Sequence, residues 1–357
     1  MSNFESKKME LHYGQVNLNI FVSPVQYYNA IYEYLNYHGL EDSEYSIASS
    51  SRCENVFHYI IDDLTYYEYK DKIQKAKVEY ANLFKDDLYV ISKQNEVTYY
   101  LLEKDNMISF ILNGCTYVIV KSSSAYEYQL LRIIREFLYR KNEDMGKVFM
   151  HAAACEYKDN GFLILGNKAA GKTSLLNYFL NEGANYIAND RAFTKDSDAQ
   201  IMIEGFPIPM RISYETVEKL NCKFEDVKYF RRQSENSDKL LITPFELSKI
   251  YQIRTVYSSP LNMVLVPEIV LQSDKLSIEP IGDDEYKNIL IRNCYTPFDE
   301  SRTQEWLYTC CTDINELKSN AENMINRLVE IPRYKLIYGT LCDPSFVIDK
   351  LYEEVVK

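Results

Sequence analysis

The 357-residue sequence lacks several features that would assign it to an obvious class. It has no run of about 18 apolar residues, so we expect no membrane-spanning helix. The first fourteen residues, MSNFESKKMELHYG, contain no apolar core of a secretion signal. A basic excess is also missing, because the formal net charge is −12. Proteins that bind nucleic acid usually carry a positive balance, so nucleic acid is not an expected partner.

Patterns that bind structural metals are also scarce. The eight cysteines are scattered without a C-x-x-C pair, and the chain contains only four histidines. We therefore expect buried thiols in a reducing compartment rather than zinc ligands or disulfides. This predicts a cytoplasmic protein.

The length and the hydrophobic pattern predict two domains. A chain of 357 residues exceeds the usual domain size of about 100–200 residues. Strand-like segments with a period of two precede residue 120, and Asn113-Gly114 between two of them is a strong hairpin signal. An amphipathic helix over residues 125–144 follows and joins the domains. We predict a smaller α+β domain with an antiparallel sheet over 1–145 and an α/β domain over 146–357.

The most informative segment is GFLILGNKAAGKTSLLNYFL at residues 161–180. An apolar strand candidate leads into Gly166, four more residues and Gly171-Lys172-Thr173, and a helix candidate follows. This order is the complete pattern of a phosphate-binding loop. The residues expected to bind the nucleotide are Gly166, Asn167, Lys168, Ala169, Ala170, Gly171, Lys172, Thr173 and Ser174.

Each residue type in this loop has a physical task. Glycines let the backbone N–H groups turn inward around a phosphate, and the helix presents its positive end to the same anion. Lys172 would add a positive charge at the β- and γ-phosphates, and the Thr173 hydroxyl would hold Mg²⁺. The sequence therefore predicts ATP and Mg²⁺ as cofactors.

Phosphoryl transfer also needs a carboxylate near the metal, and Asp190 is the best candidate. It ends ANYIAND, the strand candidate after the helix, and strand carboxyl ends line the ligand crevice of an α/β sheet. The alternative is an aspartate that only caps a helix or forms a turn. In a later apolar segment, VLVPEIV, Pro267 argues against a central strand, so we expect a core or edge strand.

HAAACEY at 151–157, the glycine loop and YIANDR at 186–191 together resemble the HPr kinase/phosphorylase family and its wider relatives. These relatives include kinases found beside peptide natural-product gene clusters. The family places a histidine on the strand before the loop strand, and ends the strand after the loop's helix in a paired acid. His151 and Asn189-Asp190 stand at those positions here.

The resemblance implies an α/β P-loop kinase core, similar to that of phosphoenolpyruvate carboxykinase, that transfers phosphate from ATP to a hydroxyl, usually of serine. The family's paired acids supply the general base and help at the metal. The first acid is Asn189 here, so Asp190 alone would carry the base role. A later glycine-rich signature of the bifunctional members is missing, which leaves the reverse phosphorylase reaction open.

Five further residues are weaker candidates, each with a structural alternative. His151 contacts phosphate or substrate, or is only hydrogen-bonded within a core strand. Glu204 is a metal ligand or a solvated loop residue. Arg211, Arg232 and Lys239 contact the substrate and neutralise charge during transfer, or simply lie on the surface.

The predicted activity is a Mg²⁺- and ATP-dependent kinase that acts on a Ser/Thr hydroxyl of a peptide or protein. One alternative is a kinase of a small hydroxylated molecule; another is a nucleotide-binding regulator without transfer activity, which Asn189 keeps open. The choice of ATP or GTP stays open, and a homo-oligomer is an option because family members often assemble. The predicted catalytic residues are Lys172, Asp190 and His151. The predicted metal ligands are Thr173, Asp190 and Glu204.

Overall fold

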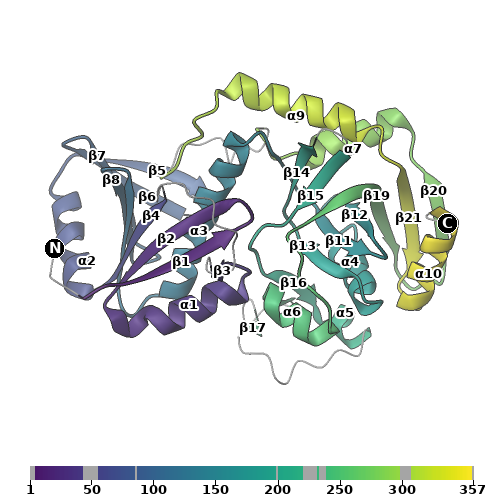
Figure 1. Cartoon of the computed structure of the whole chain (residues 1–357), viewed down its shortest axis with the longest axis horizontal. Coiled ribbons are helices and arrows are strands. Elements are labelled where there is room, and N and C mark those ends of the chain that lie inside the picture. The colour runs from purple at the N-terminus through teal and green to yellow at the C-terminus, as the bar shows by residue number, and fades with distance from the viewer. Residues whose placement is uncertain are drawn as a thin grey trace. The chain divides into compact units, whose positions relative to one another are not determined.

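The computed structural model describes residues 5–42, 55–84, 87–197, 200–219, 231–232, 239–297 and 307–355. The chain divides into two compact units, Met1–Lys141 with Glu300–Cys310 and Asn142–Asp299 with Cys311–Lys357 (Figure 1). Each unit contains a nine-stranded sheet together with helices, so the protein is mixed α/β as predicted. Within these residue ranges, no helix is both long and apolar enough to cross a membrane.

The first unit is built on a sheet of order β3-β1-β2-β4-β9-β8-β7-β6-β5. Its strands are β1 (Lys7–Tyr13), β2 (Val16–Ser23), β3 (Glu41–Asp42), β4 (Val56–Ile61), β5 (Val78–Phe84), β6 (Asp87–Gln94), β7 (Val97–Leu102), β8 (Met107–Leu112) and β9 (Cys115–Val120). Its helical segments are η1 (Val25–Tyr27), α1 (Tyr28–Tyr37), α2 (Asp63–Gln74) and most of α3 (Tyr126–Asp144).

The sheet of the first unit is mixed, whereas the sequence predicted an antiparallel one. Strands β5 to β9 do form an antiparallel meander. However, β4 pairs in parallel with both β2 and β9. A parallel pair needs a crossover connection, and α1, between β2 and β4 in the chain, provides one. A pattern of strand periods alone does not reveal such a crossover.

The second unit contains the phosphate-loop motif. Its strands are β10 (Val148–Met150), β11 (Ala153–Tyr157), β12 (Asn160–Ile164), β13 (Asn185–Ala188), β14 (Ala192–Ser197), β15 (Gln200–Glu204), β16 (Met210–Ser213), β17 (Arg231–Arg232), β18 (Lys239–Ile242), β19 (Ser258–Val270), β20 (Leu276–Pro280) and β21 (Arg333–Gly339). Its helices are α4 (Lys172–Asn181), α5 (Tyr214–Lys219), α6 (Pro244–Tyr251), α7 (Asp283–Asn293), α9 (Ile314–Leu328) and α10 (Pro344–Val355).

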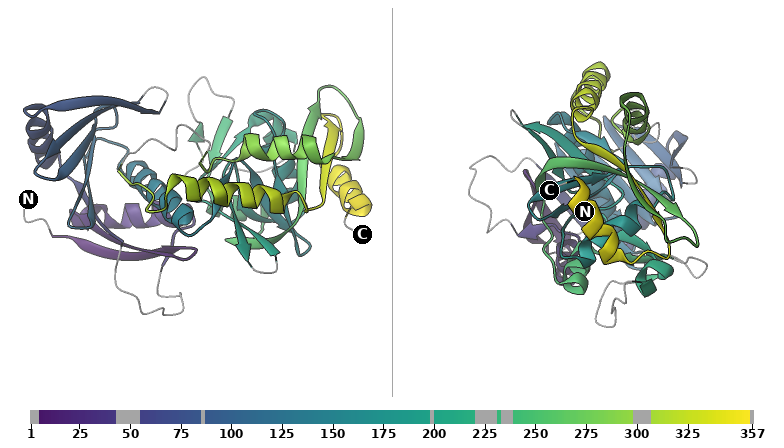
Figure 2. Two further views of the ribbon diagram at one scale, coloured as in Figure 1. Left: turned by 90° about the horizontal axis from the view of Figure 1, so that it is seen from above. Right: turned by 90° about the vertical axis from the view of Figure 1, so that its right-hand side faces the viewer.

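The large sheet of the second unit has a separate hydrophobic core on each face. Its order is β10-β14-β15-β19-β12-β11-β13, and β21 pairs with β19 and β20. One core contains apolar residues of α4 and α10, and the other contains those of α7 and α9. Helices α7 and α9 lie side by side (Figure 2). Strands β16, β18 and β17 form a small separate sheet.

Four strand ends meet at one edge of this sheet. Strand β12 is parallel to β19, which is parallel to β21. Strand β11 is antiparallel to both β12 and β13, so β13 runs in the same direction as β12. The carboxyl ends of β12, β13, β19 and β21 therefore share an edge, which is where ligands bind in open α/β sheets.

Contrary to the prediction for VLVPEIV, Pro267 lies in a central strand. Strand β19 pairs with β12 on one side and with β21 on the other. The amide of Val264 donates to Pro332 on the β21 side, so by alternation the nitrogens of Leu265 and Pro267 face β12. The last backbone bond of that side joins Leu165 N to Leu265 O, at the end of β12. Pro267 therefore lies where no ladder bond is needed.

The segment from Lys147 to Tyr157 contains two strands, and His151 is not within either of them, although it was expected on a strand. Strand β10 pairs with β14, and β11 pairs with β12 and β13. His151 lies in the break between them, and its backbone N–H donates to Asn293 O at 2.7 Å. The break places His151 at the edge where the loop lies.

None of the cysteines that the structure describes forms a disulfide. Three are buried, namely Cys155, Cys294 and Cys342. Cys115 and Cys310 are partly exposed, and Cys311 is exposed, so the prediction of buried thiols holds for half of these six. The remaining two cysteines, at positions 53 and 222, lie outside the described residues.

Candidate active site

The loop between β12 and α4 contains three residues with positive φ. They are Gly166 at 145°, Ala169 at 66° and Gly171 at 101°. A Cβ atom at Gly171 would lie 2.6 Å from Ile269 Cδ1 and 2.9 Å from the Tyr338 hydroxyl oxygen. Glycine is favoured at position 171 by the left-handed backbone, and a larger residue would also have to displace the side chains of Ile269 and Tyr338.

The N-terminus of α4 has no acceptor from a side chain at its cap. The N-cap residue is Gly171, with no side-chain capping hydrogen bond, and the first turn contains no acidic residue. The first N–H groups of a helix have no partner within the helix, and together they carry a partial positive charge. This helix end is therefore suited to an anion such as phosphate.

Lys172, the first residue of α4, directs its charge at the loop itself. Its side-chain Nζ donates to Gly166 O at 2.6 Å and to Asn167 O at 3.1 Å. The residue is only 8% exposed. Burial lowers the pKa of Lys172, and the charge of Asp190 opposes that shift. A cation that is poorly solvated and held only by carbonyl dipoles would gain from contact with an anion.

Two side-chain pairs involve the residues that follow β13, one with the loop helix α4 and one with the break between β10 and β11. The Thr173 hydroxyl donates to Asn189 Oδ1 at 3.1 Å, and Asn189 is 2% exposed. His151 Nε2 lies 3.1 Å from Asp190 Oδ1, and the His151 ring stacks on Tyr295. The structure thus brings Thr173, His151 and the Asn189-Asp190 pair to one edge of the sheet.

Asp190 is ionised at neutral pH. Its side chain is 49% exposed. Burial alone would raise the pKa of Asp190, but the hydrogen bond and charge of His151 outweigh it, helped by the charges of Arg191 and Lys172. The result is a pKa lowered to about 2. The backbone of Asp190 has positive φ, at 66°, a conformation that aspartate also adopts in turns, so the contact with His151 and not the backbone is the distinguishing feature of this residue.

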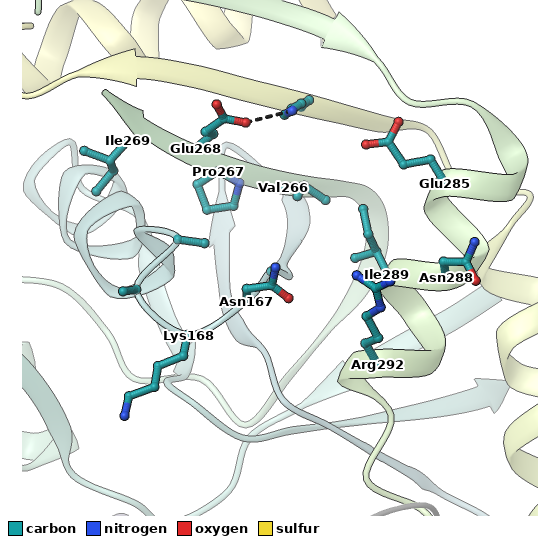
Figure 3. A pocket seen from close by; sticks show the side chains of 14 residues that line it. Asn167, Lys168, Val266, Pro267, Glu268, Ile269, Glu285, Asn288, Ile289 and Arg292 are labelled. Carbon is teal, nitrogen blue, oxygen red and sulfur yellow. Dashed lines mark ion pairs between the residues drawn. The ribbon is translucent and has the colours of Figure 1, made fainter. Parts of the chain in front are cut away.

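A pocket of about 520 Å³ adjoins the other side of the loop (Figure 3). The loop forms one wall, the end of β19 forms the second and one face of α7 forms the third. Within it, Glu268 pairs with Lys335 at 2.7 Å. The side chain of Lys168 extends away from α7 in Figure 3.

Glu204 is held by Lys147 and Tyr257, not by residues of the loop. Its Oε2 accepts from the buried Lys147 Nζ at 2.5 Å and from the Tyr257 hydroxyl at 2.8 Å. Burial lowers the pKa of Lys147, and the Glu204 carboxylate opposes that shift. The structure thus gives Glu204 a place in a buried ion pair and no contact with Thr173 or Asp190.

The three basic candidates all belong to the small sheet β16-β18-β17. Arg211 lies opposite Leu241, and Lys239 lies opposite Ser213. Arg211 and Lys239 are exposed, and by alternation they occupy the same face of this sheet. On the third strand, β17, Arg232 lies opposite Leu240 of β18.

The sequence alone does not point to several residues of the pocket. Glu268 belongs to VLVPEIV, which is predicted only as a structural strand, and no motif marks Arg292 or Lys335. The signal in the sequence was weak: Glu285, Asn288 and Arg292 share one face of α7 at helical spacing. Which element that face meets is decided only by tertiary packing.

Comparison with known proteins adds little to this geometry. No protein-family model and no curated protein sequence matches the chain. One similar solved structure is the Hpr(Ser) kinase/phosphatase from Coxiella burnetii, over 57% of this chain and 93% of that chain, with a TM-score of 0.27 and 11% sequence identity. Such similarity is compatible with a distant relation and carries no argument about activity. A function has to rest on the site itself.

Proposed function

We propose that the second unit is a phosphotransferase that binds ATP on the loop Gly166–Ser174 and transfers the γ-phosphate to a hydroxyl. The observation that carries this proposal is the meeting of three groups at one helix end. These are the uncapped N-terminus of α4, the buried Lys172 Nζ and the His151–Asp190 pair. Anion binding and a nearby carboxylate are the two requirements of phosphoryl transfer.

The residues at this edge also fit Mg²⁺. Among the residues described, no group of three or more His, Cys, Asp or Glu side chains could hold a metal ion. Mg²⁺ in kinases needs no such cage, because one or two protein ligands, phosphates and water complete its shell. Thr173 and Asp190 would supply those ligands, and Glu204 is left out because Lys147 and Tyr257 hold its carboxylate. Bound there, Mg²⁺ would screen the charge of the phosphates.

Asp190 is the proposed acceptor of the proton that the attacking hydroxyl loses. Its low pKa keeps the carboxylate ionised at neutral pH, so that it can accept a proton, and also makes Asp190 a weak base. In a loose transition state the hydroxyl proton leaves late, so a weak base that is well placed suffices. His151 would hold the carboxylate in position through its Nε2 contact at 3.1 Å.

The proposed acceptor is a Ser/Thr hydroxyl of a peptide or protein, by the resemblance to HPr kinases. The exposed face that carries Arg211 and Lys239 offers positive charge to such a substrate. A small hydroxylated molecule is the alternative acceptor. A regulator without transfer activity is favoured by one observation, the buried Asn189 amide where the family has an acid.

The first test is ADP release from ATP and Mg²⁺, with and without serine-containing peptides and small hydroxylated metabolites. We expect an acceptor to stimulate turnover. Lys172→Ala should weaken ATP binding about 100-fold, and Asp190→Asn should bind ATP but lose about 10²–10⁴-fold in turnover. Lys158→Ala, in the β11–β12 turn at the opposite end of β12, is the control. If ATP binds and Asp190→Asn is silent with every acceptor, the regulator replaces the kinase.

A further inference from the structure

The pocket and the His151–Asp190 pair lie on opposite sides of the phosphate loop. The order of neighbouring strands is β13-β11-β12-β19, with β21 beyond β19. Strand β12 leads into the loop. Asp190 follows β13 and His151 precedes β11, whereas the pocket is lined by the end of β19 and by Lys335 of β21. A nucleotide lying across the loop with its γ-phosphate toward Asp190 would extend its other end into this pocket.

Helix α7 spans the pocket from end to end. Glu285, Asn288, Ile289 and Arg292 line it from a single face of the helix, and seven residues of helix cover about 10 Å. The C-terminal end of α7 is near the catalytic side, because Asn293 O accepts from the backbone of His151. Arg292 is thus the pocket residue of α7 that is adjacent to Asn293, the residue that contacts His151, and Glu285 is at the far end of the helix.

The charges along this face change from one end to the other. In the described part of the chain, Arg292 makes no ion pair, so its charge is available at the end nearer His151. At the far end, Lys335 is already paired with Glu268, which leaves Glu285 as an additional acid. The walls between are apolar, with Val266, Pro267 and Ile289 (Figure 3).

We propose that this pocket binds the nucleoside part of the nucleotide, with α7 setting its direction. Glu285 would accept hydrogen bonds from ribose hydroxyls or a base amino group, and Pro267 and Ile289 would contact the apolar faces. Arg292 would contact the phosphates as they leave the loop. The volume of about 520 Å³ is in the range of small-molecule sites. This inference rests on the proposed function, because it presupposes a nucleotide on the loop.

The test compares ATP with inorganic tripolyphosphate, which has the phosphates but no nucleoside. Calorimetry on the full chain would give both dissociation constants in Mg²⁺ for wild type, Glu285→Ala and Asp284→Ala. These two acids are exposed neighbours in the first turn of α7, and only Glu285 lines the pocket. We expect Glu285→Ala to weaken ATP about tenfold and to leave tripolyphosphate within about twofold. Asp284→Ala should change neither.

Two results would overturn the inference while the phosphate site stands. One is equal affinity of wild type for ATP and tripolyphosphate, which means that the nucleoside adds nothing. The other is a Glu285→Ala variant that binds ATP as Asp284→Ala does. If wild type binds neither compound, the proposed function fails and this inference fails with it. Arg292→Ala adds a second readout, because it should weaken both compounds.

Discussion

Two helices of this chain follow a strand through opposite kinds of junction. Helix α2 follows β4 directly, and the carboxylate of its N-cap, Asp62, accepts from the backbone and the hydroxyl of Thr65, each at 2.7 Å. Its first turn adds the acid Asp63. Helix α4 follows β12 through the glycine loop, with Gly171 at its N-cap and no acid in its first turn.

The comparison separates a helix end that a side chain of the protein caps from one without such a cap, where we propose that phosphate binds. Both ends have N–H groups without partners inside the helix. In α2 the Asp62 side chain accepts from one of them, the N–H of Thr65, and supplies negative charge. In α4 no side chain caps the helix and the first turn contains no acid, and Lys172 adds a further positive charge. A glycine N-cap is only about 0.3 kcal/mol less favourable than a capping side chain, so the open end of α4 costs the helix little stability.

The largest effect should come from closing the space at the N-cap of α4. In Gly171→Ala, a methyl group would meet Ile269 at 2.6 Å on a backbone with φ of 101°. We expect ATP affinity to fall more than about 100-fold and stability to fall by about 3 kcal/mol. Calorimetry and urea unfolding measure both.

Gly114→Ala is the matched control for that change. Gly114 also has positive φ, at 76°, but nothing lies within 4 Å of the added methyl group. It should lose only about 1 kcal/mol and keep full ATP affinity. Equal ATP binding by the two variants would refute a nucleotide site at Gly171.

A smaller effect should follow from giving α4 the acid that α2 already has. Ser174→Asp places a carboxylate in the first turn of α4, where it competes with phosphate for the positive helix end. We expect ATP to bind about tenfold more weakly and the free protein to gain about 0.5 kcal/mol. Ser174→Asn, of similar size without charge, separates charge from bulk. If both variants bind ATP equally, the charge of the helix end plays no part.

The local part of the candidate site could be predicted from sequence, because a contiguous motif specifies it. Glycines at positions 166 and 171 and an apolar strand before them are enough to predict a strand, loop and helix over residues 161–180. The structure has β12 and α4 in that segment. The mixed α/β fold was predictable for the same reason, since strands and helices differ in hydrophobic period.

The long-range part could not be predicted. His151 and Asp190 are 39 residues apart, and their contact depends on how β11 and β13 pair. Pro267 argued against a central strand, and it is tolerated only because β12 ends beside it. The parallel pairing of β4 and the pocket face of α7 likewise depend on which elements become neighbours. The hydrophobic period of a segment predicts whether it forms a helix or a strand, but not which other element it pairs with or packs against.

The cap of α2 gives a prediction about stability alone. Asp62→Ala removes two hydrogen bonds to Thr65, so we expect the first unit to lose about 1.5 kcal/mol. Urea unfolding monitored by far-UV circular dichroism measures the loss. ATP affinity should stay unchanged, because no ligand is proposed at α2. A change in ATP affinity above about threefold would show that this helix end is not purely structural.

A last effect on stability, below about 1 kcal/mol, concerns Asp190, the acid that follows β13. Asp190 has its pKa lowered from 3.8 to about 2, so in the folded state the ionised form is favoured. A group with a lowered folded-state pKa stabilises the protein above the unfolded pKa, and loses that contribution as the pH falls through the folded value. The Asp190 side chain is 49% exposed, and solvent screening leaves less than about 1 kcal/mol of stabilisation.

Wild type should therefore exceed Asp190→Asn in stability at pH 7, and the difference should vanish between about pH 4 and pH 2. Urea unfolding across that range measures it, with the exposed turn variant Asp159→Asn as control; a difference that persists at pH 2 would mean that His151 does not hold an ionised carboxylate.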